Sequence, residues 1–147
     1  MPAVTRRTLL ESLSALPLLS AALLAASQRA DPKQASTTVY ELRVYHAAPG
    51  KLGELLTRFR EHTTKLFEKH GMKNVAYWTP VDEPESGNML VYILQHPSRE
   101  AATANWKSFQ DDPVWKRVKE ESEANGKLVD KVDSTFLALT DFSPRLH

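Results

Sequence analysis

The spacing of apolar residues switches between two periods along residues 38–140, and this alternation constrains the fold more than any other feature of the chain. A period of two is typical of a strand, and a period of three to four is typical of a helix. Proline and glycine separate the segments, which are, in order, a strand at 38–46, a helix at 52–70, strands at 74–81 and 89–96, helices at 98–111 and 113–125, and a strand at 134–140. This βαββαβ order, with the second helix divided in two, predicts a ferredoxin-like α+β fold: a four-stranded antiparallel sheet with helices on one face.

The first strand carries two different sets of side chains on its two faces: Tyr40, Leu42 and Val44 on one, and Glu41, Arg43 and Tyr45 on the other. We expect the apolar set to lie under the helices. The opposite face then combines the polar set with alternate residues of the apolar strand at 89–96, and it is too apolar to be left in water over its whole extent. We therefore expect a homodimer, packed sheet against sheet as a dimeric α/β barrel with an enclosed cavity between the sheets.

Residues 1–30 are typical of an export signal rather than of a folded domain. Arg6 and Arg7 precede a run from Ser12 to Ser27 that contains no charged residue. The run is short for a helix that spans a membrane, but it suits the apolar region of a signal peptide. The two adjacent arginines are typical of a twin-arginine signal. We expect an exported protein, periplasmic or extracellular, with no stable membrane span after processing; the alternative is a chain anchored by an uncleaved signal. The polar segment 31–37 then serves as a linker.

Two charged residues of the first strand are candidates for chemistry. Glu41 and Arg43 are two residues apart and therefore share a face. In a closed cavity Arg43 would hold an anionic ligand, and Glu41 would act as a general base if burial raises its pKa. The alternative is a structural ion pair, within the chain or across the dimer. Tyr45, on the same face, either donates a hydrogen bond to the ligand or only fills volume.

A second candidate group consists of two histidines at strand ends. His46 and His96 each end a strand that precedes a crossover, and we expect those strands to be parallel neighbours. The two rings would then lie at the same sheet edge, where they share a metal ion or line the mouth of the cavity. No third ligand is evident, and a protein metal site usually has three or four. The alternative is that both are ordinary strand-end residues, and we expect no metal site.

The remaining motifs exclude several classes of function. Trp78 and Tyr92 add to the candidate cavity as apolar walls, and the other tryptophans are assigned to the core or the interface. The chain contains no phosphate-binding, dinucleotide-binding, HExxH or GxSxG motif, so no cofactor is expected. The formal net charge of +1 gives no electrostatic reason to expect nucleic acid. The absence of cysteine excludes disulfides and thiolate metal sites.

Short motifs along residues 38–144 resemble the NIPSNAP family. The matching residues are Tyr40-Glu41-Leu42-Arg43-Val44-Tyr45, Pro49-Gly50, His70-Gly71, Trp78, Ser98-Arg99, Trp106 with Phe109, Asp112-Pro113-x-Trp115 and Phe142-Ser143-Pro144. The resemblance implies a fold similar to dimeric α/β-barrel proteins, and it implies little about a reaction. Related barrels include cofactor-independent monooxygenases, isomerases and haem-linked enzymes.

These observations favour a small-molecule-binding protein. We expect the ligand in a cavity with Glu41, Arg43 and Tyr45. One alternative is an enzyme of the same architecture that acts on an aromatic or polyketide-like compound, with Glu41 or a histidine as the base. Another is a protein-interaction module that binds no ligand.

Overall fold

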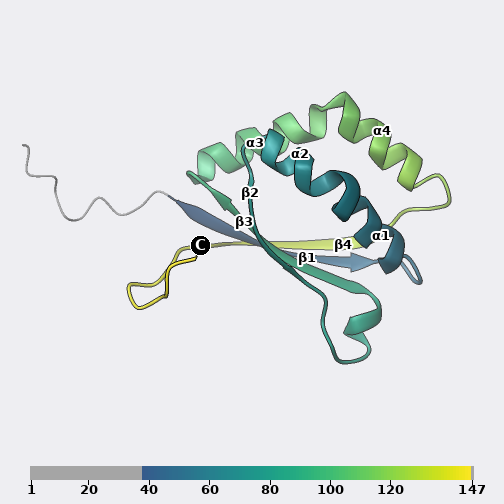
Figure 1. Ribbon diagram of the computed structural model, residues 1–147, viewed down its shortest axis with the longest axis horizontal. Coiled ribbons are helices and arrows are strands. Elements are labelled where there is room, and N and C mark those ends of the chain that lie inside the picture. The colour runs from purple at the N-terminus through teal and green to yellow at the C-terminus, as the bar shows by residue number, and fades with distance from the viewer. Residues whose placement is uncertain (1–37, 147) are drawn as a thin grey trace, which may run out of the picture. The chain divides into compact units, whose positions relative to one another are not determined.

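The computed structural model describes residues 38–146, which form one four-stranded sheet covered by helices (Figure 1). The expected signal peptide and linker, residues 1–30 and 31–37, lie outside the described residues. The elements are β1 (Val39–Ala47), α1 (Leu52–Arg58), the π-helical turn η1 (Phe59–Thr63), α2 (Thr64–Lys69), β2 (Lys73–Trp78), the 3₁₀ turn η2 (Glu85–Gly87), β3 (Met89–His96), α3 (Arg99–Asp111), α4 (Pro113–Ser122) and β4 (Val129–Leu137).

The predicted fold class is confirmed. The strand order is β2-β3-β1-β4, and every neighbouring pair is antiparallel. Helices α1, α2, α3 and α4 lie on one side of the sheet in Figure 1. The core fills the space between the two layers, and large buried members come from β3, the helices and the turn before β2: Leu55, Phe59, Phe67, Met72, Tyr92, Leu94 and Phe109.

Local signals fix the ends of the helices. The Ser98 hydroxyl accepts a hydrogen bond from the Ala101 amide at 3.1 Å and caps α3. Asp112 caps α4 in the same way through the Val114 amide, at 2.7 Å, and Pro113 takes the first helical position. Gly71 follows α2 with a φ of +76°, a conformation that residues with a side chain rarely adopt.

Several boundaries differ from the prediction: β2 ends at Trp78 rather than at 81, α4 at Ser122 rather than at 125, and β4 at Leu137 rather than at 140. The helix predicted at 52–70 is interrupted by η1, where the Thr63 hydroxyl donates to the Arg58 carbonyl at 3.2 Å. The last strand begins at Val129 rather than at Ser134. Its first half, Val129 to Asp133, contains two valines and three charged residues without a period of two, and a polar segment of this kind can pair because β4 is an edge strand with much of its surface in solvent.

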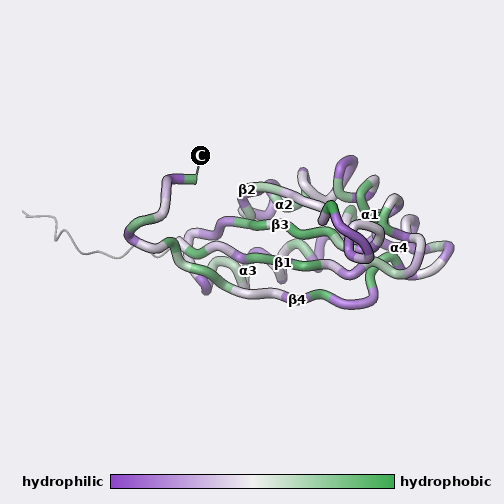
Figure 2. Tube along the Cα trace, turned by 90° about the horizontal axis from the view of Figure 1, so that it is seen from below, coloured by the Kyte–Doolittle hydropathy of each residue, from purple (hydrophilic) through white to green (hydrophobic). Residues whose placement is uncertain are grey.

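The face of the sheet away from the helices is rich in apolar residues. In Figure 2, seen from below, the strands lie side by side and apolar stretches follow β3 and β1. The strand register places Leu42 beside Ile93, and Val44 beside Val91. Trp78 of β2 pairs with Val91 and is 49 % exposed. We refer to Leu42, Val44, Trp78, Val91 and Ile93 as the open face.

Candidate functional site

The polar side chains of β1 lie under the helices, which reverses the predicted orientation of this strand. Glu41 is 1 % exposed and accepts a hydrogen bond from Trp106 of α3 at 2.6 Å. The ring of Tyr45 packs edge-on against Phe59 of η1, with 5.7 Å between centroids. The apolar set with Leu42 and Val44 occupies the open face instead. The predicted location of Glu41, Arg43 and Tyr45 between the sheets of a dimer is therefore wrong: these residues lie between the sheet and the helices of one chain.

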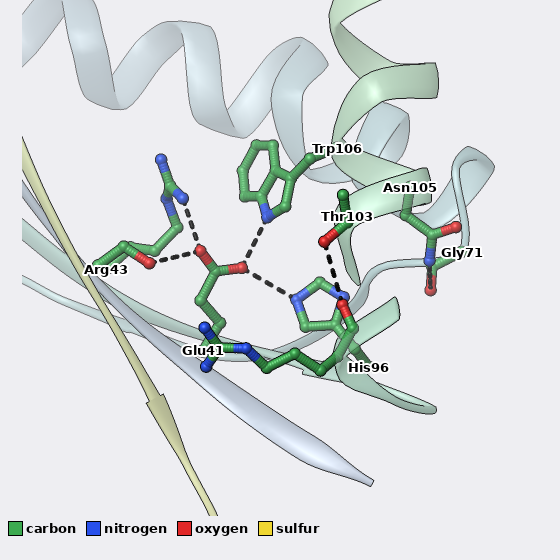
Figure 3. A network of polar contacts seen from close by, with 9 residues as sticks. Glu41, Arg43, Gly71, His96, Thr103, Asn105 and Trp106 are labelled. Carbon is green, nitrogen blue, oxygen red and sulfur yellow. Dashed lines mark hydrogen bonds and ion pairs between the residues drawn. The ribbon is translucent and has the colours of Figure 1, made fainter. Parts of the chain in front are cut away.

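Glu41 is the centre of a network of hydrogen bonds (Figure 3). Its Oε1 accepts from Arg43 Nη1 at 2.6 Å and from the Ser134 hydroxyl at 2.7 Å. Its Oε2 accepts from Trp106 Nε1 at 2.6 Å and from His96 Nε2 at 3.1 Å. The four donors come from β1, β4, α3 and β3, so this one carboxylate ties the three strands to the helix layer.

The electrostatics of Glu41 do not fit a general base. Burial raises the pKa of the Glu41 carboxyl, but hydrogen bonds from His96, Trp106, Ser134 and Arg43 together outweigh burial and lower this pKa to about 2. The prediction that burial raises the pKa of Glu41 overall is therefore wrong. An ionised carboxylate with four donors and so low a pKa has little tendency to take up a proton near neutral pH. The geometry matches the alternative of a structural ion pair within the chain.

Arg43 lies among aromatic rings as well as beside Glu41. Its Cζ is 4.2 Å from the ring centroid of Trp106 and 5.5 Å from that of Tyr45. Burial lowers the pKa of Arg43, but Tyr45, Tyr92 and the Glu41 carboxylate raise this pKa by more than burial lowers it. The guanidinium therefore stays charged. Its Nε is buried and has no hydrogen-bond partner in the described part of the chain.

The two histidines do not meet. Because β1 and β3 are antiparallel rather than parallel, His96 pairs with Val39 at one end of the sheet, and His46 pairs with Met89 at the other. His96 is fully buried under the helices beside Glu41. His46 lies on the opposite face, where its Nε2 is 2.9 Å from Asp133 Oδ2. The idea of a shared metal ion at one edge is wrong, and residues 38–146 contain no group of three or more potential metal ligands.

The structure separates the two aromatic candidates as well. Tyr92 is fully buried under the helices, directly opposite Arg43 in the sheet. Trp78 belongs to the open face and lies on the other side of the sheet. Five of the seven predicted site residues therefore gather on the helix side, namely Glu41, Arg43, Tyr45, Tyr92 and His96.

A cleft of about 400 Å³ opens beside this group, between β4 and α4. Tyr45, Trp115, Val129 and Val132 form its apolar walls. Its charged residues are four basic and two acidic, namely Arg58, Lys119, Lys127 and Lys131 against Glu123 and Asp130. Arg58 pairs with Glu123 at 2.9 Å, and Lys127 with Asp130 at 2.8 Å. No ion-pair partner of Lys119 occurs within residues 38–146, so the cleft has a cationic character. We call this the β4 cleft.

Sequence reasoning missed Arg58, Lys119 and Ser134. Arg58 is 5 % exposed although it is charged, and its Cζ lies 5.2 Å from the ring centroid of Trp115. A signal was present, because Arg58 follows Leu55 by three residues and so falls on the apolar side of the helix. Ser134 and Lys119 carry no comparable pattern.

A larger groove of about 660 Å³ lies between α1 and α4. Its lining includes three exposed glutamates, Glu54, Glu61 and Glu121, and none of the predicted site residues lines it. The β4 cleft is the better candidate because it reaches Tyr45, which contacts both Arg43 and Tyr92.

Among the helices in residues 38–146, none is both long and apolar enough to cross a membrane.

Residues 40–144 match the protein-family model described as NIPSNAP. Among curated proteins, none matches the chain. A NIPSNAP-like domain protein from Burkholderia xenovorans superposes with a TM-score of 0.65 at 17 % identity, covering 76 % of this chain and 93 % of that one. A NIPSNAP family protein from Agrobacterium tumefaciens gives 0.63 at 20 % identity, covering 76 % and 96 %. A monooxygenase from the gene ActVA-Orf6 of Streptomyces coelicolor gives 0.52 at 15 % identity, covering 75 % and 95 %. These likenesses establish the fold.

Proposed function

Since the chain belongs to the NIPSNAP family, we propose that it is a small-molecule-binding member, which holds an anionic compound with a planar apolar body in the β4 cleft. The observation that carries the proposal is the composition of the cleft. Two aromatic rings, Tyr45 and Trp115, offer flat apolar contact, and Lys119 offers a cation without a competing carboxylate. The Streptomyces coelicolor monooxygenase was solved with the ligand nanaomycin D, so a protein of similar fold holds a small organic molecule.

The geometry favours binding over catalysis by Glu41. The alternative of an enzyme that uses Glu41 as its base requires a carboxylate with a free lone pair, whereas both oxygens of Glu41 are engaged by two donors each. We assign Glu41 the role of holding Arg43, Trp106 and Ser134 in place. A module that binds other proteins without a ligand is the remaining alternative, and the experiments below separate it.

The first test identifies what the protein carries. Full-length chain, purified from its own host under native conditions, is examined by native mass spectrometry, and we expect a bound small molecule that is lost on denaturation. Calorimetry then compares 2-naphthoate with the neutral 2-naphthamide, which has the same ring system. We expect the carboxylate to bind at least about 10-fold more tightly, a difference of about 1.4 kcal/mol.

Variants locate the site. Lys119→Gln removes the unpaired cation of the cleft and should weaken naphthoate binding several-fold. Lys65→Gln, an exposed lysine of α2 outside the cleft, is the matched control and should bind as the original chain does. The proposal fails if no small molecule is bound and naphthoate does not bind, or if the amide binds as well as the carboxylate.

We further propose that two copies associate through their open faces. Leu42, Val44, Val91, Ile93 and Trp78 form a contiguous apolar surface on three neighbouring strands, and such surfaces on soluble proteins are typical of interfaces. Analytical ultracentrifugation should give a dimer for the original chain and a monomer for Leu42→Asp. Val81→Asp is the control, because Val81 is 90 % exposed in the loop that follows β2. A monomeric original chain at micromolar concentration would contradict this proposal.

Export remains a proposal as well, supported by Arg6, Arg7 and the uncharged run that ends at Ser27. Cell fractionation with N-terminal sequencing should find a shortened chain outside the cytoplasm. Replacement of both arginines by lysine should retain the full-length chain inside the cell. A full-length chain in the membrane fraction would instead indicate an uncleaved anchor.

A further inference from the structure

Among the buried polar atoms without a hydrogen-bond partner, two donors belong to residues that face each other on the helix side of the sheet. The Tyr92 hydroxyl and Arg43 Nε are both inaccessible to solvent and unpartnered in the described part of the chain. Arg43 and Tyr92 are directly opposed across β1 and β3, so their side chains leave the sheet side by side on the same face. An unsatisfied polar group in a protein interior is destabilising, and pairs of them point to a missing partner.

Tyr45 lies between this pair and the β4 cleft. Its ring lines the cleft, packs edge-on against Tyr92 with 5.3 Å between centroids, and lies 5.5 Å from Arg43 Cζ. Burial raises the pKa of Tyr92, and the neighbouring Tyr45 raises it further, so the Tyr92 hydroxyl keeps its proton. The Tyr45 and Tyr92 hydroxyls interact, but the pair does not reach full hydrogen-bond geometry, so the Tyr92 hydroxyl lacks a complete partner until a ligand displaces Tyr45.

We propose that Arg43 Nε and the Tyr92 hydroxyl form the inner end of the β4 cleft, a subsite that binds an oxygen acceptor of the ligand after Tyr45 turns aside. The subsite presents one charged donor and one neutral donor, which together fit a carboxylate, enolate or phenolate oxygen. The aromatic rings of Tyr45 and Tyr92 suit a planar body attached to that oxygen. This inference rests on the proposed function, because it places the anionic end of the same ligand: Lys119 attracts that end through its charge, and Arg43 and Tyr92 bind it directly.

Two tyrosines of one aromatic cluster provide a matched test. Tyr92 and Tyr77 are stacked, with 5.2 Å between centroids, but the Tyr77 hydroxyl donates to Asn74 Oδ1 whereas that of Tyr92 has no partner. Tyr92→Phe removes an unsatisfied hydroxyl, so we expect it to raise the unfolding temperature of the ligand-free chain by about 3 °C or more. Tyr77→Phe removes a satisfied hydroxyl and should lower the unfolding temperature.

Ligand binding should respond in the opposite order. With 2-naphthoate as the probe, we expect Tyr92→Phe to weaken binding about 10-fold and Tyr77→Phe to leave it within twofold. Arg43→Lys, which keeps the charge beside Glu41 but removes Nε, should weaken naphthoate binding as well. A gain of stability together with a loss of affinity is the signature that a purely structural tyrosine would not give.

Two results would refute the subsite alone, and a third would refute the proposed function together with it. The subsite is refuted if Tyr92→Phe lowers the unfolding temperature, because its hydroxyl then has a partner in solution. It is also refuted if Tyr92→Phe binds naphthoate as tightly as the original chain, and in that case binding in the outer cleft still stands. If the original chain does not bind naphthoate at all, the proposed function fails and the subsite fails with it.

Discussion

Replacement of Glu41 by glutamine tests whether the buried carboxylate holds the sheet and the helices together. The substitution keeps the shape of the side chain but exchanges one acceptor oxygen for an NH2 group, which only donates. If that group takes the place of Oε2, it faces Trp106 Nε1, which cannot accept; if it takes the place of Oε1, it faces Arg43 Nη1, which cannot accept either. Each orientation therefore sets one donor against another and leaves Arg43 without its counter-charge.

The magnitude follows from the pKa of Glu41. Folding lowers this pKa from its usual value of 4.5 to about 2, and each unit corresponds to about 1.4 kcal/mol. The ionised carboxylate thus contributes about 3 kcal/mol to the free energy of unfolding, similar to the cost of breaking a buried ion pair. Because the folded pKa lies below the unfolded one, this contribution is fully present above about pH 4.5 and is lost as the pH falls through about 2.

Urea denaturation of the full-length chain and of Glu41→Gln, at one protein concentration and at pH 7, 5, 4 and 3, measures the effect. We expect the variant to be about 3 kcal/mol less stable at pH 7, and the difference to shrink by roughly half or more at pH 3. Glu61→Gln is the control, because that side chain is 60 % exposed, and it should change stability by less than about 0.5 kcal/mol. A Glu41→Gln chain as stable as the original at pH 7, or a difference that does not vary with pH, would refute the reasoning.

Other substitutions test the helix junctions by thermal or urea denaturation. Gly71→Ala should destabilise the chain by about 1 kcal/mol or more, because φ is +76° and the new Cβ would lie 3.1 Å from Asn105 Nδ2. At Gly53 in α1, a new Cβ would meet no atom within 4 Å, so Gly53→Ala should stabilise the chain by roughly 0.5–1 kcal/mol. Asp112→Ala should lower the unfolding temperature, because Asp112 caps α4 and accepts from Lys69 and His70 at 2.7 Å each. Asp111→Ala, which removes only an exposed pair with Lys107, should not.

The order of elements was predictable because each depends on neighbouring residues. The apolar repeat of the first helix, the Ser98 and Asp112 caps and the glycine at position 71 all act within one or two turns of chain. The start of β4 was not predictable in this way, because Val129–Ser134 is mostly polar, has no period of two and pairs only as the edge of a sheet assembled from distant segments.

The orientation of β1 was beyond the sequence for a related reason. Alternation shows that Glu41 and Arg43 share a face, and general hydrophobicity places the apolar set inward. The burial of Glu41 becomes favourable only when His96, Trp106 and Ser134 supply donors, and these residues lie 55, 65 and 93 positions away in the chain. The apolar set is then left on the open face, where the dimer proposal accounts for it.

The orientation of β1 decides whether a ligand site is formed by one chain or shared by two copies. A cavity between two sheets would be shared by both copies and would vanish when they separate. The β4 cleft, by contrast, is formed by strands β1 and β4, helices α1 and α4, and the segment between α4 and β4. All of these belong to one chain. Ligand binding and association are therefore separable. The monomeric Leu42→Asp chain should bind 2-naphthoate as tightly as the original, with one molecule per chain by calorimetry. A loss of binding that accompanies the loss of the dimer would mean that a residue of the second copy completes the cleft, and the site would then have to be placed at the interface.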